Sequence, residues 1–182
     1  STGASRVDVS KRGAMEPEVL ELTDGRVLMI VRTQLGEIYA SYSKDQGESW
    51  SPAEPWGVRS PESPATLRRI PATGDLLLAW NPVYEARAGH GGKRTPLVAA
   101  ISTDEGKTWS QPRELPGALT GDRHTGKYAP DGRLFISFRD TTFESPTRGD
   151  WVGWVGTYED IVEGREGQYR LRLMDNKHDW DC

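Results

Sequence analysis

The sequence predicts an all-β chain that is built from repeated four-stranded units. Glycine and proline account for 20 and 12 of the 182 residues, and short apolar runs alternate with turn residues. Few segments keep a helical period of hydrophobic residues for three turns. Two kinds of sequence element also recur at intervals of roughly 50 to 60 residues. We therefore expect little helix and several copies of one β motif.

The first repeated element is a glycine-containing turn that leads into an apolar strand. It reads Asp-Gly-Arg-Val-Leu-Met-Ile-Val-Arg at 24–32, Thr-Gly-Asp-Leu-Leu-Leu-Ala-Trp-Asn at 73–81 and Asp-Gly-Arg-Leu-Phe-Ile-Ser-Phe-Arg at 131–139. Strands that are apolar at nearly every position are expected to be covered on both faces, as in sheets that stack face to face.

The second repeated element is an octapeptide that we call the box. It reads Ser-Lys-Asp-Gln-Gly-Glu-Ser-Trp at 43–50 and Ser-Thr-Asp-Glu-Gly-Lys-Thr-Trp at 102–109. Its Asp can accept backbone N–H groups, its Gly permits a positive φ angle, and its Trp can fill an apolar gap. We interpret Asp45, Asp104, Trp50 and Trp109 as structural residues of a turn and not as ligand contacts.

Together the two elements define a unit with four strands. Strand A precedes the glycine turn, strand B follows it, strand C ends in the box and strand D follows the Trp. Three units span about residues 15–60, 61–119 and 120–174, and Asp181 would begin a fourth. The third unit lacks the box but keeps strand C at 151–158 and strand D at 168–173.

Four-stranded units of this length are typical of β-propeller blades. Closed propellers have about four to eight blades, so three units do not complete a ring. The sequence therefore predicts that residues 1–182 form one partial propeller domain of a larger protein. If such a partial ring existed alone, its two uncovered blade faces would favour self-association.

Composition excludes several classes of function. The net charge of −4, with charged residues at 27%, disfavours binding to nucleic acid through a strong global positive field. The single cysteine, Cys182, excludes an intramolecular disulfide and a cysteine-based zinc cluster. No apolar run approaches the roughly 18 residues of a membrane span. The start of the sequence has no apolar signal core, so any targeting peptide is expected outside this chain. The compartment is therefore not predicted from composition.

No metal or nucleotide cofactor is predicted. The three histidines, His90, His124 and His178, do not have the spacing of metal ligands. No phosphate-binding glycine motif precedes a helical segment.

Candidate functional residues come from the ends of strand B. In a four-stranded meander, strand A starts at the same end of the sheet at which strand B finishes, and the box lies at the opposite end. Arg32, Asn81 and Arg139 each lie seven residues after a strand-leading glycine. We therefore expect these three polar residues at one mouth of the propeller.

The starts of strand A should lie at the same mouth. Counting nine residues back from Gly25 and Gly132 gives Glu16 and Arg123, and Ser63 takes the corresponding place in the second unit. His124, beside Arg123, and Asp181, at the start of a fourth unit, join the set of mouth residues.

Two interpretations of these mouth residues are open. Polar residues at strand ends often only reach water, but their recurrence in three units favours a polar ligand. Arginine binds planar carboxylates through paired N–H donors, so an anionic group is the expected ligand. The long loops at 82–96 and 140–150 face the same mouth, either as lids or as ordinary solvated loops.

The chain resembles the Asp-box (BNR-repeat) proteins, and among them the sialidase superfamily of six-bladed β-propellers. Besides the boxes, the resemblance rests on Glu-Pro-Glu-Val-Leu-Glu-Leu at 16–22, Ser-Pro-Ala-Thr-Leu at 63–67 and Arg-His-Thr-Gly-Lys-Tyr-Ala-Pro at 123–130. It covers nearly the whole chain, which looks like the N-terminal half of a sialidase-like protein. The resemblance also makes a secreted or periplasmic location an expectation.

The resemblance implies an arginine triad that holds a sugar carboxylate and a tyrosine nucleophile supported by a carboxylate. By geometry, Arg32, Arg123 and Arg139 are the candidate arginines. An Arg-Ile-Pro sequence, a motif of the family, occurs at 69–71, but at the end of strand A, and we interpret Arg69 as coincidental. Glu16 occupies the place where the family has an arginine, which departs from the sialic acid pattern.

Asp140 and Glu16 are the candidate groups for proton transfer. Glycosidases generally need two acidic groups in different protonation states. Asp140 directly follows Arg139 at the mouth, although an ordinary salt-bridged loop Asp is an equally good interpretation. The nucleophile that the resemblance implies would come from sequence outside this chain.

The leading prediction is a sialidase-like exo-glycosidase that hydrolyses a terminal acidic sugar, with a glycan as its partner. The alternative is a non-catalytic propeller that binds carbohydrate or protein, because one fold carries either function. A third interpretation is another glycosidase or a lyase that uses Glu16 and a second carboxylate.

Overall fold

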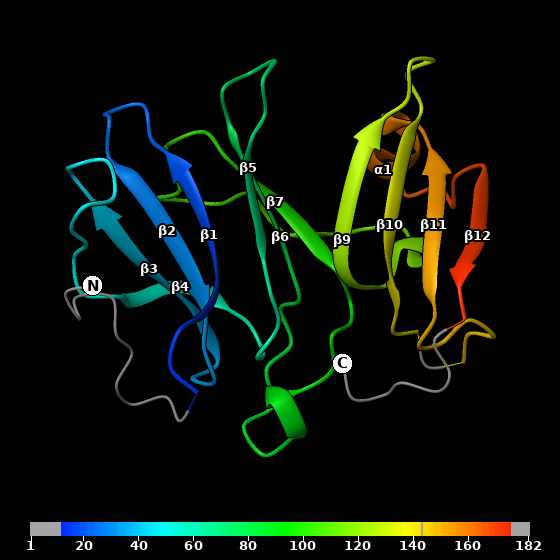
Figure 1. The fold of residues 1–182 in the computed structure, drawn as a ribbon, viewed down its shortest axis with the longest axis horizontal. Helices are drawn as coiled ribbons and strands as arrows, with labels where there is room; N and C mark the ends of the chain where they lie inside the picture. Colours follow the sequence, from blue (N-terminus) through cyan, green and yellow to red (C-terminus); the bar gives the residue numbers. More distant parts are fainter. Residues whose placement is uncertain (1–11, 143, 176–182) are drawn as a thin grey trace. The chain divides into compact units, whose positions relative to one another are not determined.

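The structure, a computed structural model, describes residues 12–142 and 144–175. Its strands form three four-stranded sheets, in the orders β1-β2-β3-β4, β5-β6-β7-β8 and β12-β11-β10-β9. Strands that are consecutive in the chain are neighbours in each sheet, so every sheet is a meander (Figure 1). The predicted all-β class with four-stranded units is confirmed.

The elements have the following bounds. The first sheet contains β1 (Met15–Glu21), β2 (Val27–Arg32), β3 (Glu37–Ser43) and β4 (Glu54–Arg59). The second contains β5 (Thr66–Arg69), β6 (Leu76–Trp80), β7 (Val98–Ser102) and β8 (Arg113–Glu114). The third contains β9 (Gly121–Tyr128), β10 (Leu134–Asp140), β11 (Trp151–Gly156) and β12 (Tyr169–Met174). Helical segments are short: η2 (Gly89–Gly91), η3 (Gly117–Leu119) and α1 (Tyr158–Val162).

The chain divides into two compact units, each with its own core. Unit 1 comprises residues 1–93 and 98–113, and unit 2 comprises residues 94–97 and 114–182. The buried core of unit 1 consists of Leu22, Leu28, Ile30, Ile38, Ala40, Val58, Leu67, Leu76, Leu78, Trp80, Val98 and Ala100. That of unit 2 consists of Ala118, Leu119, Phe138, Val152 and Trp154.

The glycine turn has the same geometry in all three sheets. Gly25, Gly74 and Gly132 have φ angles of 81°, 81° and 83°, which an L side chain rarely adopts. In each turn the glycine N–H donates to the carbonyl three or four residues back, at 2.8 to 3.0 Å. The recurring sequence therefore specifies one turn, and this turn fixes where strand B begins in each sheet.

The two boxes form nearly identical hydrogen-bonded turns. Asp45 accepts the backbone N–H of Ser49 at 2.9 Å, and Asp104 accepts that of Thr108 at 2.9 Å. The hydroxyls of Ser49 and Thr108 donate to the same carboxylates at 2.5 and 2.6 Å. These bonds, followed by those from the preceding serine, lower the pKa of Asp45 and of Asp104 to about 2.

The third sheet replaces the box with a short helix. Thr157 caps α1 by accepting the backbone N–H of Asp160, whose carboxylate accepts the N–H of Thr157 in return. The indole of Trp154 donates to the carbonyl of Glu166 at 2.7 Å. A capped helix therefore lies in the connection between β11 and β12, whereas the corresponding connection in each of the other two sheets contains the box.

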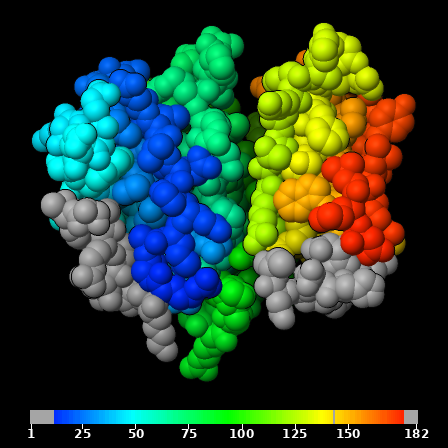
Figure 2. Space-filling view, in the orientation of Figure 1, coloured from blue at the N-terminus to red at the C-terminus, as the bar shows by residue number. Residues whose placement is uncertain are grey.

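Unit 2 exposes apolar side chains along β12 and on β10. Tyr169, Leu171, Leu173 and Met174 are exposed on β12, which is coloured red in Figure 2, and Phe135 is exposed on β10. A neighbouring blade covers such a face in a closed propeller. Self-association of the chain alone stays a prediction.

Candidate functional site

The three strand ends predicted to carry polar groups do so in the structure. Arg32 is the last residue of β2, Asn81 directly follows β6, and Arg139 is the penultimate residue of β10. Each lies opposite the glycine turn of its own sheet. The two units are described separately below, because each contains its own cluster of charged side chains.

Strand A begins with the same backbone irregularity in both units. Glu16 in β1 and Arg123 in β9 have φ angles of 48° and 60°, in the left-handed region. At both positions the pairing register with strand B shifts. In β1 the shift lies between Met15 and Glu18, and in β10, the partner of β9, it lies between Ser137 and Arg139. Such bulges redirect a side chain and are common beside active sites. Both Glu16 and Arg123 are exposed.

In unit 1 the bulge residue pairs with the end of the neighbouring strand. A guanidinium nitrogen of Arg32 lies 3.1 Å from a carboxylate oxygen of Glu16. The side chain of Arg32 is 11% exposed, whereas that of Glu16 is 48% exposed. The arginine is therefore held within the unit while its partner carboxylate reaches solvent.

A second group in unit 1 surrounds Glu62, in the connection from β4 to β5. The side chain of Glu62 is 2% exposed and lies 2.6 Å from the guanidinium of Arg12. It also accepts from Gln34 at 3.3 Å and contacts Nδ1 of His90 at 3.2 Å. Burial, the largest influence, raises the pKa of Glu62, but the bonds from His90 and Gln34 and the charge of Arg12 outweigh it and leave the pKa lowered.

The loop that follows β6 is fastened to this group. The backbone N–H of Glu62 donates to the carbonyl of His90 at 2.8 Å. The ring of Tyr84 lies against Gly36 and Gly91, where an added Cβ would approach ring atoms to 2.6 and 2.9 Å. His90 itself has a left-handed φ of 53° and an exposed ring. The 82–96 segment, predicted as a lid or a solvated loop, is thus anchored at its centre.

Ser63 and Asn81 lie beneath the surface of unit 1. Ser63 is fully buried, and its hydroxyl has no hydrogen-bond partner. Asn81 is also buried. Neither side chain reaches solvent. A part for Ser63 and Asn81 in the binding site stays a prediction.

In unit 2 the arginine at the strand end has a buried partner. Arg139 donates to both carboxylate oxygens of Asp122, at 2.9 and 2.5 Å. Arg94 donates to the same carboxylate at 2.5 Å, and the side chain of Asp122 is only 1% exposed. Burial, the largest influence, raises the pKa of Asp122, but the two guanidinium groups outweigh it and keep the pKa lowered.

Asp140 anchors the long loop after β10. Its carboxylate lies 2.9 Å from the guanidinium of Arg170 and accepts from the hydroxyl of Thr147 at 2.7 Å and the N–H of Thr142 at 2.8 Å. Burial alone would raise the pKa of Asp140, but its hydrogen bonds, including those from Arg170 and Thr147, hold the pKa well below its usual range. Asp140 is therefore an ionised group that organises the loop.

His124 packs inside unit 2. Its ring stacks on Phe138 with centroids 4.7 Å apart, and its Nε2 lies 2.8 Å from the carbonyl of Leu119. Burial lowers the pKa of His124, so the ring is neutral at neutral pH. Arg123, the preceding residue, is exposed. Asp181, the last predicted member of the set, lies outside the described residues.

Sequence reasoning missed Glu62, Asp122 and Arg94. Asp122 directly precedes the predicted pair Arg123 and His124, and Glu62 directly precedes Ser63. The available signal was a carboxylate beside a predicted mouth residue, but no pattern in the sequence distinguishes a buried carboxylate from a solvated one.

The described residues contain neither a candidate metal site nor a membrane-spanning helix. Within residues 12–142 and 144–175, no group of three His, Cys, Asp or Glu side chains is placed to hold a metal ion. In the same part of the chain, no helix has the length and apolar character needed to cross a membrane.

The comparisons with known proteins identify the family. The BNR repeat-like domain matches residues 2–152, and the chain belongs to this family. A Dyadobacter fermentans protein of unknown function is similar at 20% identity and a TM-score of 0.53, over 90% of this chain and 43% of its own. A leech intramolecular trans-sialidase complexed with 2,7-anhydro-Neu5Ac is similar at 15% identity and a TM-score of 0.51, over 88% of this chain and 24% of its own.

These likenesses establish the fold. The chain has the fold of a partial β-propeller of the sialidase type, as the sequence predicts, and it spans less than half the length of either structure. The comparison with curated proteins finds no match.

Proposed function

We propose that the protein containing this chain is a sialidase-like exo-glycosidase that hydrolyses a terminal acidic sugar, such as a sialic acid, from a glycoconjugate. The observation that carries the proposal is the pair of Arg32 and Glu16. An ion pair with one half-exposed partner is worth about 0–1 kcal/mol. A substrate carboxylate can therefore replace Glu16 on Arg32, and the planar guanidinium suits that ligand.

Replacement of Glu16 by the substrate carboxylate gives both Arg32 and Glu16 a role. Arg32, held within unit 1, binds the sugar carboxylate, and Glu16 becomes available for proton transfer at the substrate. Arg123, exposed by the equivalent bulge in unit 2, stays a predicted binding residue. Arg139 supports its strand end through Asp122. Asp140 stays a prediction for proton transfer, and its lowered pKa and its pair with Arg170 make it a weak base.

Glu62 and His90, which contact each other, add a second means of proton transfer in unit 1. Glu62 contacts Nδ1 of His90 and so fixes the orientation of an exposed imidazole. A buried carboxylate that orients a histidine is a recurring arrangement in general acid–base catalysis. We include His90 and Glu62 in the proposed site on this ground.

The alternative, a propeller that binds a glycan without cleaving it, has one specific observation in its favour. Three buried carboxylates of the two units, Glu62, Asp122 and Asp140, all lie beside arginines and all have lowered pKa values. None of the three is a protonated acid at neutral pH. A hydrolase therefore needs its acid from Glu16, from His90 or from sequence outside this chain.

The test is release of a fluorogenic aglycone from a panel of acidic and neutral glycosides by the protein that contains this chain. We expect turnover of a sialoside or a related acidic glycoside. Arg32→Gln should lower kcat/KM by about 100-fold, because a charge-assisted pair contributes about 2–3 kcal/mol. Arg26→Gln, which removes a partly exposed arginine at the opposite end of the sheet, is the matched control and should leave turnover unchanged.

Absence of turnover on every acidic glycoside would reject hydrolysis. Binding of the same glycosides without turnover, lost in Arg32→Gln, would support the alternative. Equal turnover of acidic glycosides in wild type and Arg32→Gln would reject the assignment of Arg32.

A further inference from the structure

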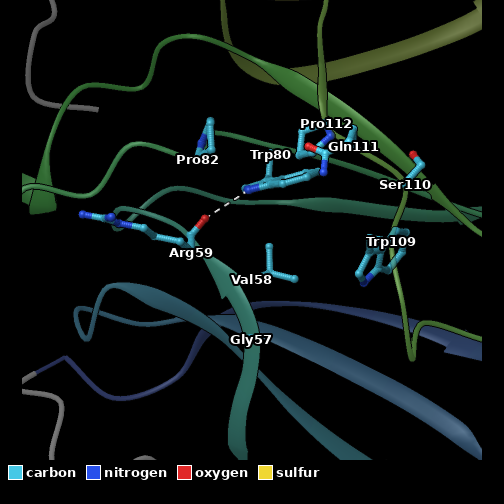
Figure 3. Close-up of a pocket in the computed structure, with 9 residues that line it drawn as sticks. All are labelled: Gly57, Val58, Arg59, Trp80, Pro82, Trp109, Ser110, Gln111 and Pro112. Atoms are coloured by element: carbon cyan, nitrogen blue, oxygen red, sulfur yellow. Dashed lines mark hydrogen bonds between the residues drawn. The ribbon is translucent and has the colours of Figure 1, made fainter.

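A pocket in unit 1 lies apart from the charged groups described above. It has a volume of about 340 Å³ and lies between β4 and the segment that leads from the second box toward β8 (Figure 3). Its lining residues are Gly57, Val58, Arg59, Trp80, Pro82, Trp109, Ser110, Gln111 and Pro112. None of Glu16, Arg32, Gln34, Glu62 or His90 lines it.

The pocket contains a hydrogen-bond donor that the fold leaves unused. The indole nitrogen of Trp109 is buried and has no hydrogen-bond partner. By contrast, the indole of Trp50, at the same position of the first box, donates to the carbonyl of Gly47 at 3.0 Å. Trp80, which also lines the pocket, donates to the carbonyl of Arg59 at 3.0 Å. The unused donor is thus specific to the second box.

The box turn itself does not explain this donor. The contacts of Ser, Asp and Ser or Thr in the second box repeat those of the first to within 0.2 Å. The ring of Trp109 packs edge-on against Trp56, with centroids 5.5 Å apart, a contact that needs an aromatic ring but no N–H group. A buried donor without a partner costs about 1–3 kcal/mol, so each such group calls for an explanation.

The rest of the pocket combines apolar walls with polar groups at its rim. Val58, Trp80, Pro82 and Pro112 supply the walls, while Arg59, Ser110 and Gln111 are exposed. The hydroxyl oxygen of Ser110 accepts the N–H of Ile101 at 3.0 Å, which leaves its own hydrogen to donate. The size and this mixture of surfaces are those of a small-molecule site rather than of a protein interface.

We propose that this pocket binds one ring of a saccharide, at a site separate from the proposed reaction site. A sugar ring has an apolar C–H face, which matches the walls, and hydroxyl and ring oxygens, which match the rim. Because the indole nitrogen of Trp109 is buried, its ring turns in the bound state so that the N–H donates to one of those oxygens. The site is a second glycan contact for the protein, and it does not depend on whether the protein hydrolyses glycosides.

The experiment is a titration of the protein, labelled with ¹⁵N-tryptophan, with galactose, N-acetylglucosamine and lactose. The indole N–H signal of Trp109 is assigned by its loss in Trp109→Phe. We expect at least one sugar to shift this signal with a Kd of about 1–10 mM, the range of a small ligand with few contacts. Gln111→Ala, a change at an exposed residue, should weaken binding by about two- to tenfold, the value of one hydrogen bond.

Trp50→Phe is the matched control. It removes the equivalent indole from the first box, so it should leave the sugar-induced shift of Trp109 unchanged. The proposal is overturned if none of the three sugars shifts the Trp109 signal at about 50 mM, well above the expected Kd. It is also overturned if a proline-rich peptide shifts that signal and the sugars do not. Neither result bears on glycoside hydrolysis, which the turnover assay tests.

Discussion

The starts of β1 and β9 share a backbone bulge but hold their arginines in different ways. In unit 1 the carboxylate that pairs with Arg32 is the bulge residue itself, Glu16, which is half exposed. In unit 2 the carboxylate precedes the bulge, at Asp122, where it is buried and binds Arg139 through two bonds. A shift of one residue along the strand therefore separates an ion pair with a half-exposed carboxylate from one with a buried carboxylate.

The comparison ranks the arginines predicted from the sequence. Arg32 and Arg139 are equivalent by their distance from the glycine turn, yet only Arg32 has a partner that solvent and a ligand can reach. Arg139 shares Asp122 with Arg94, a residue far from it in the sequence. Position at a strand end identifies candidates, but only the structure shows whether the carboxylate that pairs with each arginine is buried.

Replacing Asp122 with Asn should have the largest effect on stability. It leaves two arginines without their shared carboxylate, and breaking a buried ion pair costs about 3–5 kcal/mol. The measurement is urea unfolding followed by tryptophan fluorescence, to which Trp151 and Trp154 of unit 2 contribute. Asp131→Asn removes an exposed ion pair with Arg133 in the same unit and should change the free energy of unfolding by less than about 1 kcal/mol. Equal effects of the two substitutions would contradict the structural role of Asp122.

Acidification should have an intermediate effect on stability, because it protonates the Asp residues of the two boxes in unit 1. The pKa values of Asp45 and Asp104 are about 2, below the value of 3.8 for an ordinary Asp. Their ionised forms therefore stabilise the folded state above pH 3.8, and this contribution is lost as the pH falls toward 2. The melting temperature should decline more steeply over this window in wild type than in an Asp45→Asn, Asp104→Asn double variant. Parallel declines would show that the boxes do not contribute to acid sensitivity.

Replacing Glu16 with Gln should have the smallest effect on stability, within about 1 kcal/mol, because the ion pair is half exposed. The same substitution should strengthen the binding of free sialic acid, since the ligand no longer competes with Glu16 for Arg32. Urea unfolding and isothermal titration of the protein that contains this chain measure the two quantities. A loss of stability as large as that of Asp122→Asn would show that the ion pair of Arg32 stabilises the fold as much as the ion pair of Arg139 does.

Local sequence was sufficient to predict the repeating architecture. The glycine turn and the box are specified by residues within one short segment, through a left-handed glycine and an Asp that accepts nearby N–H groups. Three glycine turns, two boxes and the strands between them were therefore predictable. The capped helix α1 was missed although its cap is also local, since Thr157 and Asp160 lie three residues apart and bond each other.

The sequence by itself determined the strand order, the turns and the ends of the sheets at which polar residues gather, because each follows from contacts between near neighbours in the chain. Only the tertiary structure decided which charges are paired and which are exposed. Glu62 and Asp122 become buried because residues as distant as Arg12, His90 and Arg94 pack against them. Burial and long-range pairing depend on the packing of whole elements, so the electrostatics of the candidate site could not be read from local sequence.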